Sequence, residues 1–139
     1  LLFSLLSWLV VGTIPPQFDI LLHPIAFAGW IGLFVTSINL FPIGQLDGGH
    51  ITYALFGRFH SVISSILVGV LGALGTASLL WGIAWEGWLV WAMLMLLLGL
   101  EHPPVLFPEY RLDPLRRKIG FFSFVVFIIT FVPTPFQFL

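Results

Sequence analysis

The chain has 139 residues, of which 59% are hydrophobic and 8% charged, and its formal net charge is -1. Soluble domains carry about 25% charged residues, so five basic and six acidic residues are too few to cover a water-soluble surface of this size. The composition excludes a soluble enzyme, a disordered tail and a nucleic-acid binder, which would need a basic excess. The chain also lacks cysteine, which excludes disulfides and thiolate metal sites. These exclusions indicate a polytopic membrane protein.

Uncharged stretches predict the membrane spans, because a helix needs about 20 apolar residues to cross a bilayer. Residues 1–12 are apolar without an initiator Met or the basic start of a signal peptide, so we interpret the chain as a fragment that begins inside a span. The other expected spans are residues 25–46, 61–85, 87–100 and 119–139. We therefore expect residues 1–139 to form one all-α transmembrane domain, a bundle of about five spans with the first truncated.

The basic residues predict the orientation of these spans. Arg58 lies between the second and third spans, and Arg111, Arg116, Arg117 and Lys118 lie between the fourth and fifth. All five basic residues therefore fall on one side of the membrane. The positive-inside rule makes that side cytoplasmic.

Residues 39–50 do not have the pattern of a plain span. Pro42 must kink or end the helix that enters this stretch, and Gly44 and Gly48 allow backbone angles that are closed to other residues. Irregular backbone at membrane depth is tolerated only beside protein or a water-filled cavity. An Asp at a helix centre costs about 2.5 to 3.5 kcal/mol on insertion scales, so Asp47 marks a candidate functional site on a broken helix. The alternative interpretation makes Asp47 the N-cap of a helix over residues 48–57, and the two roles are compatible.

The same stretch carries a family resemblance. Asn39-x-x-Pro42 followed by Leu46-Asp47-Gly48 resembles the N-x-x-P-x-x-x-x-D-G signature of site-2 proteases, which are intramembrane zinc metalloproteases. Three further stretches resemble the C-terminal half of a branch of that family: Glu101-His102-Pro103-Pro104, Leu112-Asp113-Pro114 and residues 131–136. The resemblance covers most of the chain from His23 onward, and it identifies residues 1–139 as the C-terminal half of such a membrane core.

The resemblance implies roles for five residues. Asp47 would be the third ligand of one zinc ion, and Asn39 would orient or polarise the substrate carbonyl. Pro42, Gly44 and Gly48 would shape the backbone near the substrate. A carboxylate beside two imidazoles is an accepted ligand set for catalytic zinc, which activates water and polarises a carbonyl. The expected partners are the lipid bilayer and a transmembrane peptide substrate.

The family's other motif, H-E-x-x-H, does not occur in these 139 residues. That motif supplies two histidine ligands and a glutamate base, which we therefore expect upstream of Leu1. This chain alone is expected to be inactive. The alternative function is a catalytically inactive membrane scaffold or regulator, and a third is a transporter or channel that uses Asp47 as an ion site, although no second broken-helix motif supports it.

The four histidines are expected to lie at span boundaries or, for His50, to support the site. We expect His50 to be an interfacial residue or to support the site rather than to ligate zinc. His60 is expected to be solvated at the membrane boundary. His23 and His102, each followed by a proline, are expected to mark the ends of spans.

Overall fold

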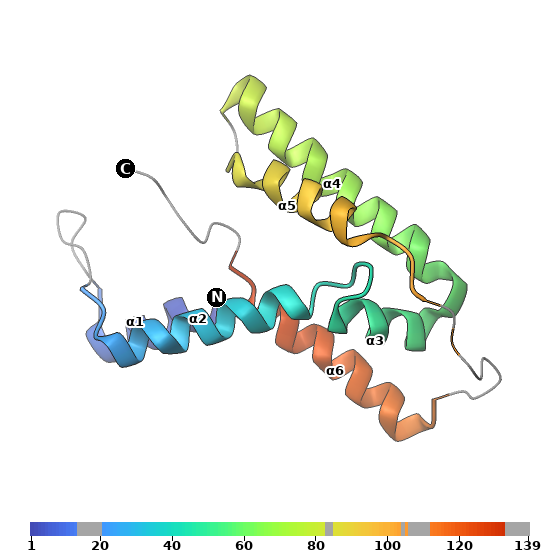
Figure 1. The fold of residues 1–139 in the computed structure, drawn as a ribbon. Coiled ribbons are helices and arrows are strands. Elements are labelled where there is room, and N and C mark those ends of the chain that lie inside the picture. Colours follow the sequence, from blue (N-terminus) through green and yellow to red (C-terminus); the bar gives the residue numbers. More distant parts are fainter. Residues whose placement is uncertain (14–20, 83–84, 104, 106–111, 133–139) are drawn as a thin grey trace.

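The computed structural model describes residues 1–13, 21–82, 85–103, 105 and 112–132. The secondary structure of these residues is helical, as the sequence predicts (Figure 1). The elements in chain order are α1 (Leu2–Val11), α2 (Pro24–Asn39), α3 (Asp47–Phe56), a 3-10 turn η1 (Gly57–Phe59), α4 (His60–Trp81), α5 (Gly87–Leu98) and α6 (Pro114–Thr130).

Prolines and glycines set most of the helix ends. Pro24 is the first residue of α2, where its missing N–H costs nothing, and the Nδ1 atom of His23 accepts a hydrogen bond from the Ile25 N–H at 3.3 Å. His23 is therefore a helix-boundary residue, as expected. At the C-terminal end of α4, Gly82 has the left-handed conformation, with φ of 64°. Glycine adopts this conformation without strain.

Most predicted spans and observed helices have different bounds; α4, for example, ends at Trp81 rather than at residue 85. The stretch 25–46 is not one helix, because α2 already ends at Asn39. The last helix begins at Pro114 rather than at residue 119, because the Asp113 carboxylate accepts a hydrogen bond from the Arg116 N–H at 2.8 Å and caps it. Arg111, the connection 14–20 and residues 133–139 lie outside the described residues.

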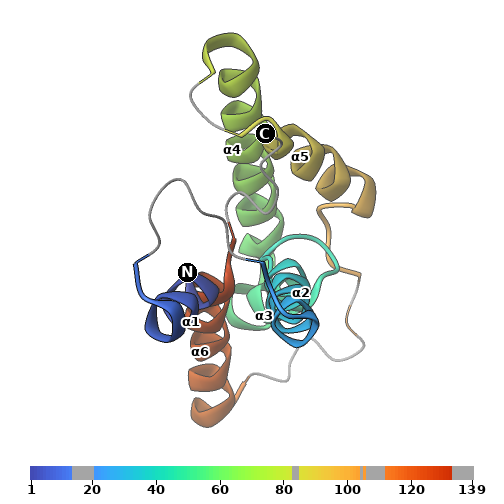
Figure 2. The ribbon, with the colours of Figure 1, turned by 90° about the vertical axis from the view of Figure 1, so that its left-hand side faces the viewer.

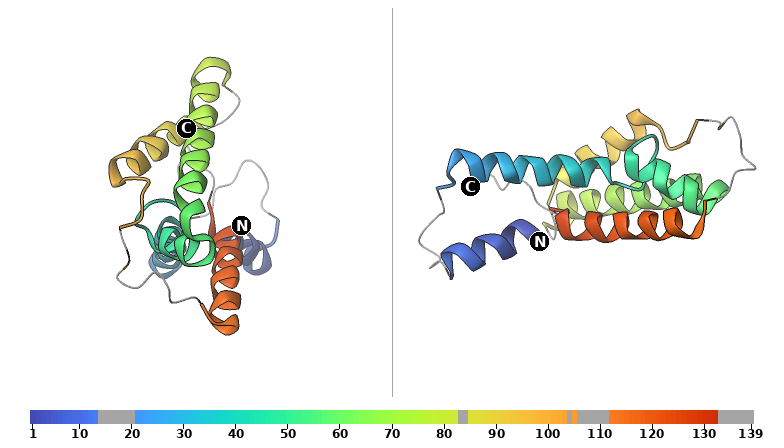
Figure 3. Two further views of the ribbon diagram at one scale, coloured as in Figure 1. Left: turned by 90° about the vertical axis from the view of Figure 1, so that its right-hand side faces the viewer. Right: turned by 90° about the horizontal axis from the view of Figure 1, so that it is seen from below.

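The helices pack around the turn that joins α2 to α3. α4 and α5 form the most extensive helix pair, and they splay apart toward the C-terminal end of α5 (Figures 2 and 3). α6 contacts α1, α2 and α3. The buried apolar core consists of Phe41, Ile43, Val68, Leu71, Trp88, Ala92 and Met95. The α2–α3 turn thus contributes Phe41 and Ile43 to the same core as α4 and α5.

The described part of the chain contains one helical run that is long and apolar enough to cross a membrane, the 35 residues of Asp47–Trp81. The apolar helices Leu2–Val11, Pro24–Asn39 and Gly87–Leu98 are shorter. Large apolar side chains are nevertheless exposed on several of these helices, for example Val10, Leu80 and Leu97. Exposed apolar surface on this scale marks contact with a membrane or with other protein.

The cap of α6 leads to a stability prediction. Asp113→Ala is expected to lower the free energy of unfolding by about 1 kcal/mol, because the Arg116 N–H loses its acceptor. Arg116→Ala is the matched control, since it keeps the cap and removes only an exposed ion pair of 3.4 Å, a kind of pair worth about 0 to 1 kcal/mol. Thermal unfolding in detergent compares them, and an equal loss in both variants would contradict the capping role.

Candidate functional site

The candidate site is the turn between α2 and α3. α2 ends at Asn39, α3 begins at Asp47, and the backbone between them follows no regular helix. Local hydrogen bonds hold this turn: the Ile43 N–H donates to the Phe41 carbonyl at 2.8 Å, and the His50 N–H donates to the Leu46 carbonyl at 2.9 Å. The predicted break in the helix is confirmed.

Apolar residues of the turn anchor it to the rest of the fold. The ring of Phe41 meets the rings of Phe127 and Phe131 on and after α6 edge to face, with centroids 5.1 and 5.6 Å apart. Ile43 is 1% exposed in the shared core. The Gly44 N–H donates to the buried Ser64 hydroxyl of α4 at 3.3 Å. The turn is therefore held from α4 and from α6, which limits how far the polar groups at its ends can move.

Three glycines permit the close backbone contacts of this turn. A side chain at Gly48 would collide with the Leu40 carbonyl, and one at Gly49 would collide with the Gly44 carbonyl. Gly44 itself has φ of 57°, in the left-handed region, and lies against the carbonyl of Gly99. These contacts involve backbone atoms, which cannot rotate away, so the first turn of α3 can pack here only if positions 48 and 49 are glycine.

Asn39 and Asp47 stand at the two ends of this anchored turn, and both residues are exposed. Within the described residues, neither a hydrogen bond nor an ion pair engages the Asp47 carboxylate. The structure corrects its interpretation as an N-cap: Leu46 is the N-cap, no side chain caps α3, and Asp47 is the first residue inside the helix. In that position its charge still interacts favourably with the helix dipole.

The donor set of this turn fits part of a metal site. A carboxylate with no partner among the described residues, on backbone held from two sides, can act as an oxygen ligand for zinc. No group of three or more potential metal ligands occurs among the residues that the structure describes. The turn therefore offers one ligand, and a complete site needs further donors.

One histidine contradicts its expectation, and two others form a pair that was not predicted. His60 is not solvated: it is 1% exposed, and its Nε2 atom lies 3.5 Å from the Ser64 hydroxyl. The side chains of His50 and His102 form a hydrogen bond, with Nδ1 of His50 2.7 Å from Nε2 of His102. This pairing was missed by the sequence analysis, because the two residues are 52 positions apart and no local pattern connects them.

The comparisons with known proteins agree with the motif. The sequence profile of peptidase family M50 matches residues 11–81, about half of the chain. A relative from Arabidopsis thaliana, "Probable zinc metallopeptidase EGY3, chloroplastic", is 46% identical over 65 residues, which are 43% of this chain and 11% of the relative. "Probable zinc metalloprotease EGY2, chloroplastic" from Oryza sativa subsp. indica is 44% identical over 52 residues, 37% of this chain and 10% of the relative.

The similarity to these plant proteins is local. The matched part of the chain spans about a tenth of the length of these relatives, and no solved structure matches the chain. The profile match contains the whole Asn39–Asp47 turn together with α2, α3 and α4. The chain belongs to peptidase family M50, the site-2 protease family.

Proposed function

We propose that the full-length protein is an intramembrane zinc metalloprotease of site-2 type that cleaves a transmembrane segment of its substrate. The carrying observation is the pair of exposed polar residues, Asn39 and Asp47, at the two ends of a turn that is anchored to the core. Membership of peptidase family M50 and the zinc metalloprotease names of the relatives support the proposal.

In this proposal Asp47 provides the third zinc ligand through its free carboxylate. Asn39 donates a hydrogen bond from its uncharged amide to the oxygen of the scissile carbonyl, which gains negative charge as water attacks. Pro42, Gly44 and Gly48 keep the two side chains at fixed helix ends. When bound, zinc would supply a water of pKa about 7 and polarise the carbonyl. The two histidine ligands and the general base come from a part of the protein outside these 139 residues.

The proposed location is a membrane that the chain crosses several times. The exposed apolar side chains on α1, α4 and α5 support contact with lipid. In the proposed topology Arg58 and the basic residues between positions 111 and 118 lie on the cytoplasmic side, or on the corresponding side of an organelle membrane. The partners are the lipid bilayer and a transmembrane peptide.

Removal of the metal tests the proposal. The full-length protein, purified in detergent, is expected to contain one zinc per chain and to cleave a panel of labelled single-span peptides. Treatment with a chelator is expected to abolish cleavage, because an unactivated water attacks a peptide bond very slowly, and added zinc is expected to restore it. Cleavage that continues after the zinc has been removed would contradict the proposal.

A second candidate is a catalytically inactive membrane scaffold of the same family. This candidate holds if the full-length protein, like these 139 residues, has no H-E-x-x-H motif. In that case the full-length protein would bind a single-span peptide without cleaving it, and zinc would not change the result. The same purified protein therefore distinguishes the two candidates.

A further inference from the structure

A short segment after α5 lies across the candidate site. This segment, residues 99–103, is called the cross-segment below. At its start the carbonyl of Gly99 lies against the α-carbon side of Gly44 in the α2–α3 turn. Three residues later, His102 reaches the side chains of α3. The cross-segment therefore contacts both the turn between Asn39 and Asp47 and the helix that Asp47 begins.

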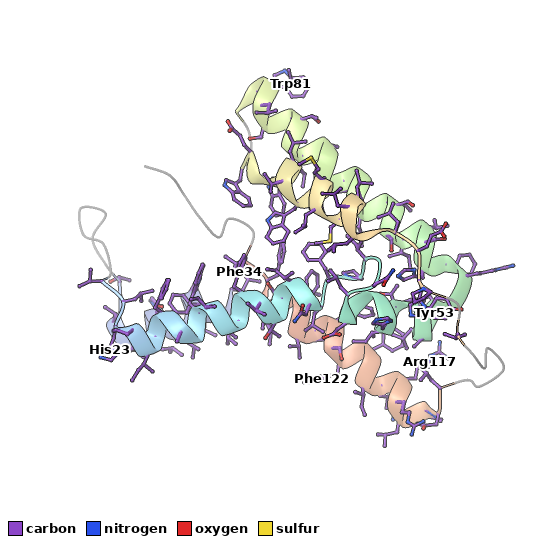
Figure 4. The ribbon with its side chains drawn as sticks, viewed as in Figure 1. His23, Phe34, Tyr53, Trp81, Arg117 and Phe122 are labelled. Carbon is purple, nitrogen blue, oxygen red and sulfur yellow. The ribbon has the colours of Figure 1, made fainter. Side chains whose placement is uncertain are left out.

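His102 packs on α3 with a defined geometry. Its ring stacks on the ring of Tyr53, with centroids 4.1 Å apart and planes 13° apart. It meets the ring of His50 edge to face at 4.7 Å and the ring of His60 at 5.8 Å. Figure 4 shows Tyr53 on α3, far from Trp81 at the C-terminal end of α4. The ring of His102 is thus held by one face against the ring of Tyr53, and the nitrogens at the edge of the His102 ring can form hydrogen bonds.

The hydrogen bonds of this group allow one arrangement of hydrogens when both rings are neutral. Nδ1 of His102 lies 2.6 Å from the carbonyl oxygen of Pro103, and a carbonyl only accepts, so this nitrogen carries the hydrogen. Nε2 of His102 then has the electron pair and accepts from Nδ1 of His50 at 2.7 Å. His50 is left with an electron pair on Nε2.

The position of His50 relative to Asp47 allows this electron pair to accept a hydrogen bond near the Asp47 carboxylate. The two residues are three positions apart in α3 and both are exposed, a spacing that places side chains on one helix face. Histidines that act at metal sites commonly donate their second N–H to a fixed acceptor, which sets the tautomer and raises the basicity of the other nitrogen. His102 is such an acceptor.

We propose that His102 is a positioning residue of the Asn39–Asp47 site: it holds His50 in the tautomer that carries hydrogen on Nδ1 and leaves Nε2 of His50 as a hydrogen-bond acceptor for water at Asp47. The arrangement of hydrogens follows from the contacts of this chain alone. The effect on zinc rests on the proposed function. His50 and His102 act here as supporting groups and not as metal ligands, in keeping with the absence of a three-ligand group among the described residues.

The test reads the tautomer directly. Imidazole nitrogens of full-length protein with ¹⁵N-labelled histidine are observed by NMR, about two pH units above the usual imidazole pKa of about 6.5. In the wild type, His50 is expected to carry its hydrogen on Nδ1. His102→Phe keeps a ring on Tyr53 but removes the acceptor, so His50 is expected to shift toward the other tautomer. His102→Gln keeps an acceptor oxygen and is expected to restore the wild-type signal.

The same variants are titrated with zinc against a competing chelator. His102→Phe is expected to weaken zinc binding roughly tenfold, within the range for supporting groups of metal ligands, and His102→Gln is expected to recover most of that loss. His23→Gln, at the distant start of α2, is the control and should change neither measurement.

Each outcome decides the proposal. A wild-type His50 with its hydrogen on Nε2, or a tautomer that His102→Phe leaves unchanged, overturns the positioning role. An unchanged zinc affinity in His102→Phe overturns its connection with the metal site. A full-length protein that binds no zinc overturns the proposed function instead, and the NMR result then decides the tautomer alone.

Discussion

Replacing Asp47 with Ala in the full-length protein is expected to abolish stoichiometric zinc binding and, with it, peptide cleavage. Removal of a supporting group costs roughly 10- to 100-fold in metal affinity, and removal of a ligand should cost more than that. Asp47 is exposed, and no side chain in the described part of the chain pairs with it, so the variant should still fold. Loss of its favourable interaction with the helix dipole costs about 0.3 to 1 kcal/mol. Metal analysis after dialysis measures the zinc.

Asn39→Ala distinguishes a loss of zinc binding from a loss of catalytic rate. Asn39 lies at the other end of the turn and is proposed to bind the carbonyl oxygen rather than zinc. The variant should keep its zinc and lose roughly 10²- to 10³-fold in kcat, the usual cost of removing one donor to an oxyanion. Asp113→Asn, at the N-cap of α6, is the control for removing a carboxylate elsewhere. Normal zinc content and cleavage in Asp47→Ala would refute the role of Asp47.

The sequence predicts the helices better than it predicts their contacts. The break after α2 was predicted from Pro42, whose effect on the backbone is local. Gly82 and Gly99 end α4 and α5 before residues 85 and 100, where the predicted spans end. The start of α6 was placed too late because the prediction followed uncharged residues, although Asp113 and Pro114 already form a cap and a first helical residue. A helix can contain charged residues, as the first turns of α6 do, so the bounds of an uncharged stretch are not the bounds of a helix.

The site could be found only in part from the sequence. The break at Pro42 was predicted because it depends on neighbouring residues, and the same stretch singled out Asp47. The burial of His60 was not, since it depends on Gly57 turning α4 back beside α3, with φ of 55°, and on His102 arriving from beyond α5. A motif therefore locates the proposed ligand, while the residues proposed to support it come from packing between distant segments.

Gly48→Ala is expected to destabilise the protein by about 3 kcal/mol, the upper part of the usual range for overpacking, and to weaken zinc binding. The added methyl group would collide with the Leu40 carbonyl, a backbone atom at the end of α2. The start of α3 must then move away from the turn, and Asp47 is the residue next to the collision. Thermal unfolding and zinc titration of the full-length variant measure the two effects.

Gly69→Ala is the matched control for Gly48→Ala. Both substitutions add one methyl group within a helix, and alanine is favoured over glycine there by about 1 kcal/mol. A methyl group at Gly69 would meet nothing within 4 Å, so this variant should be unchanged or slightly more stable. The difference between the two variants therefore reports the close approach alone. If both variants kept wild-type stability and zinc affinity, the first turn of α3 could not be packed against the end of α2, and the anchored turn could not be what positions Asp47.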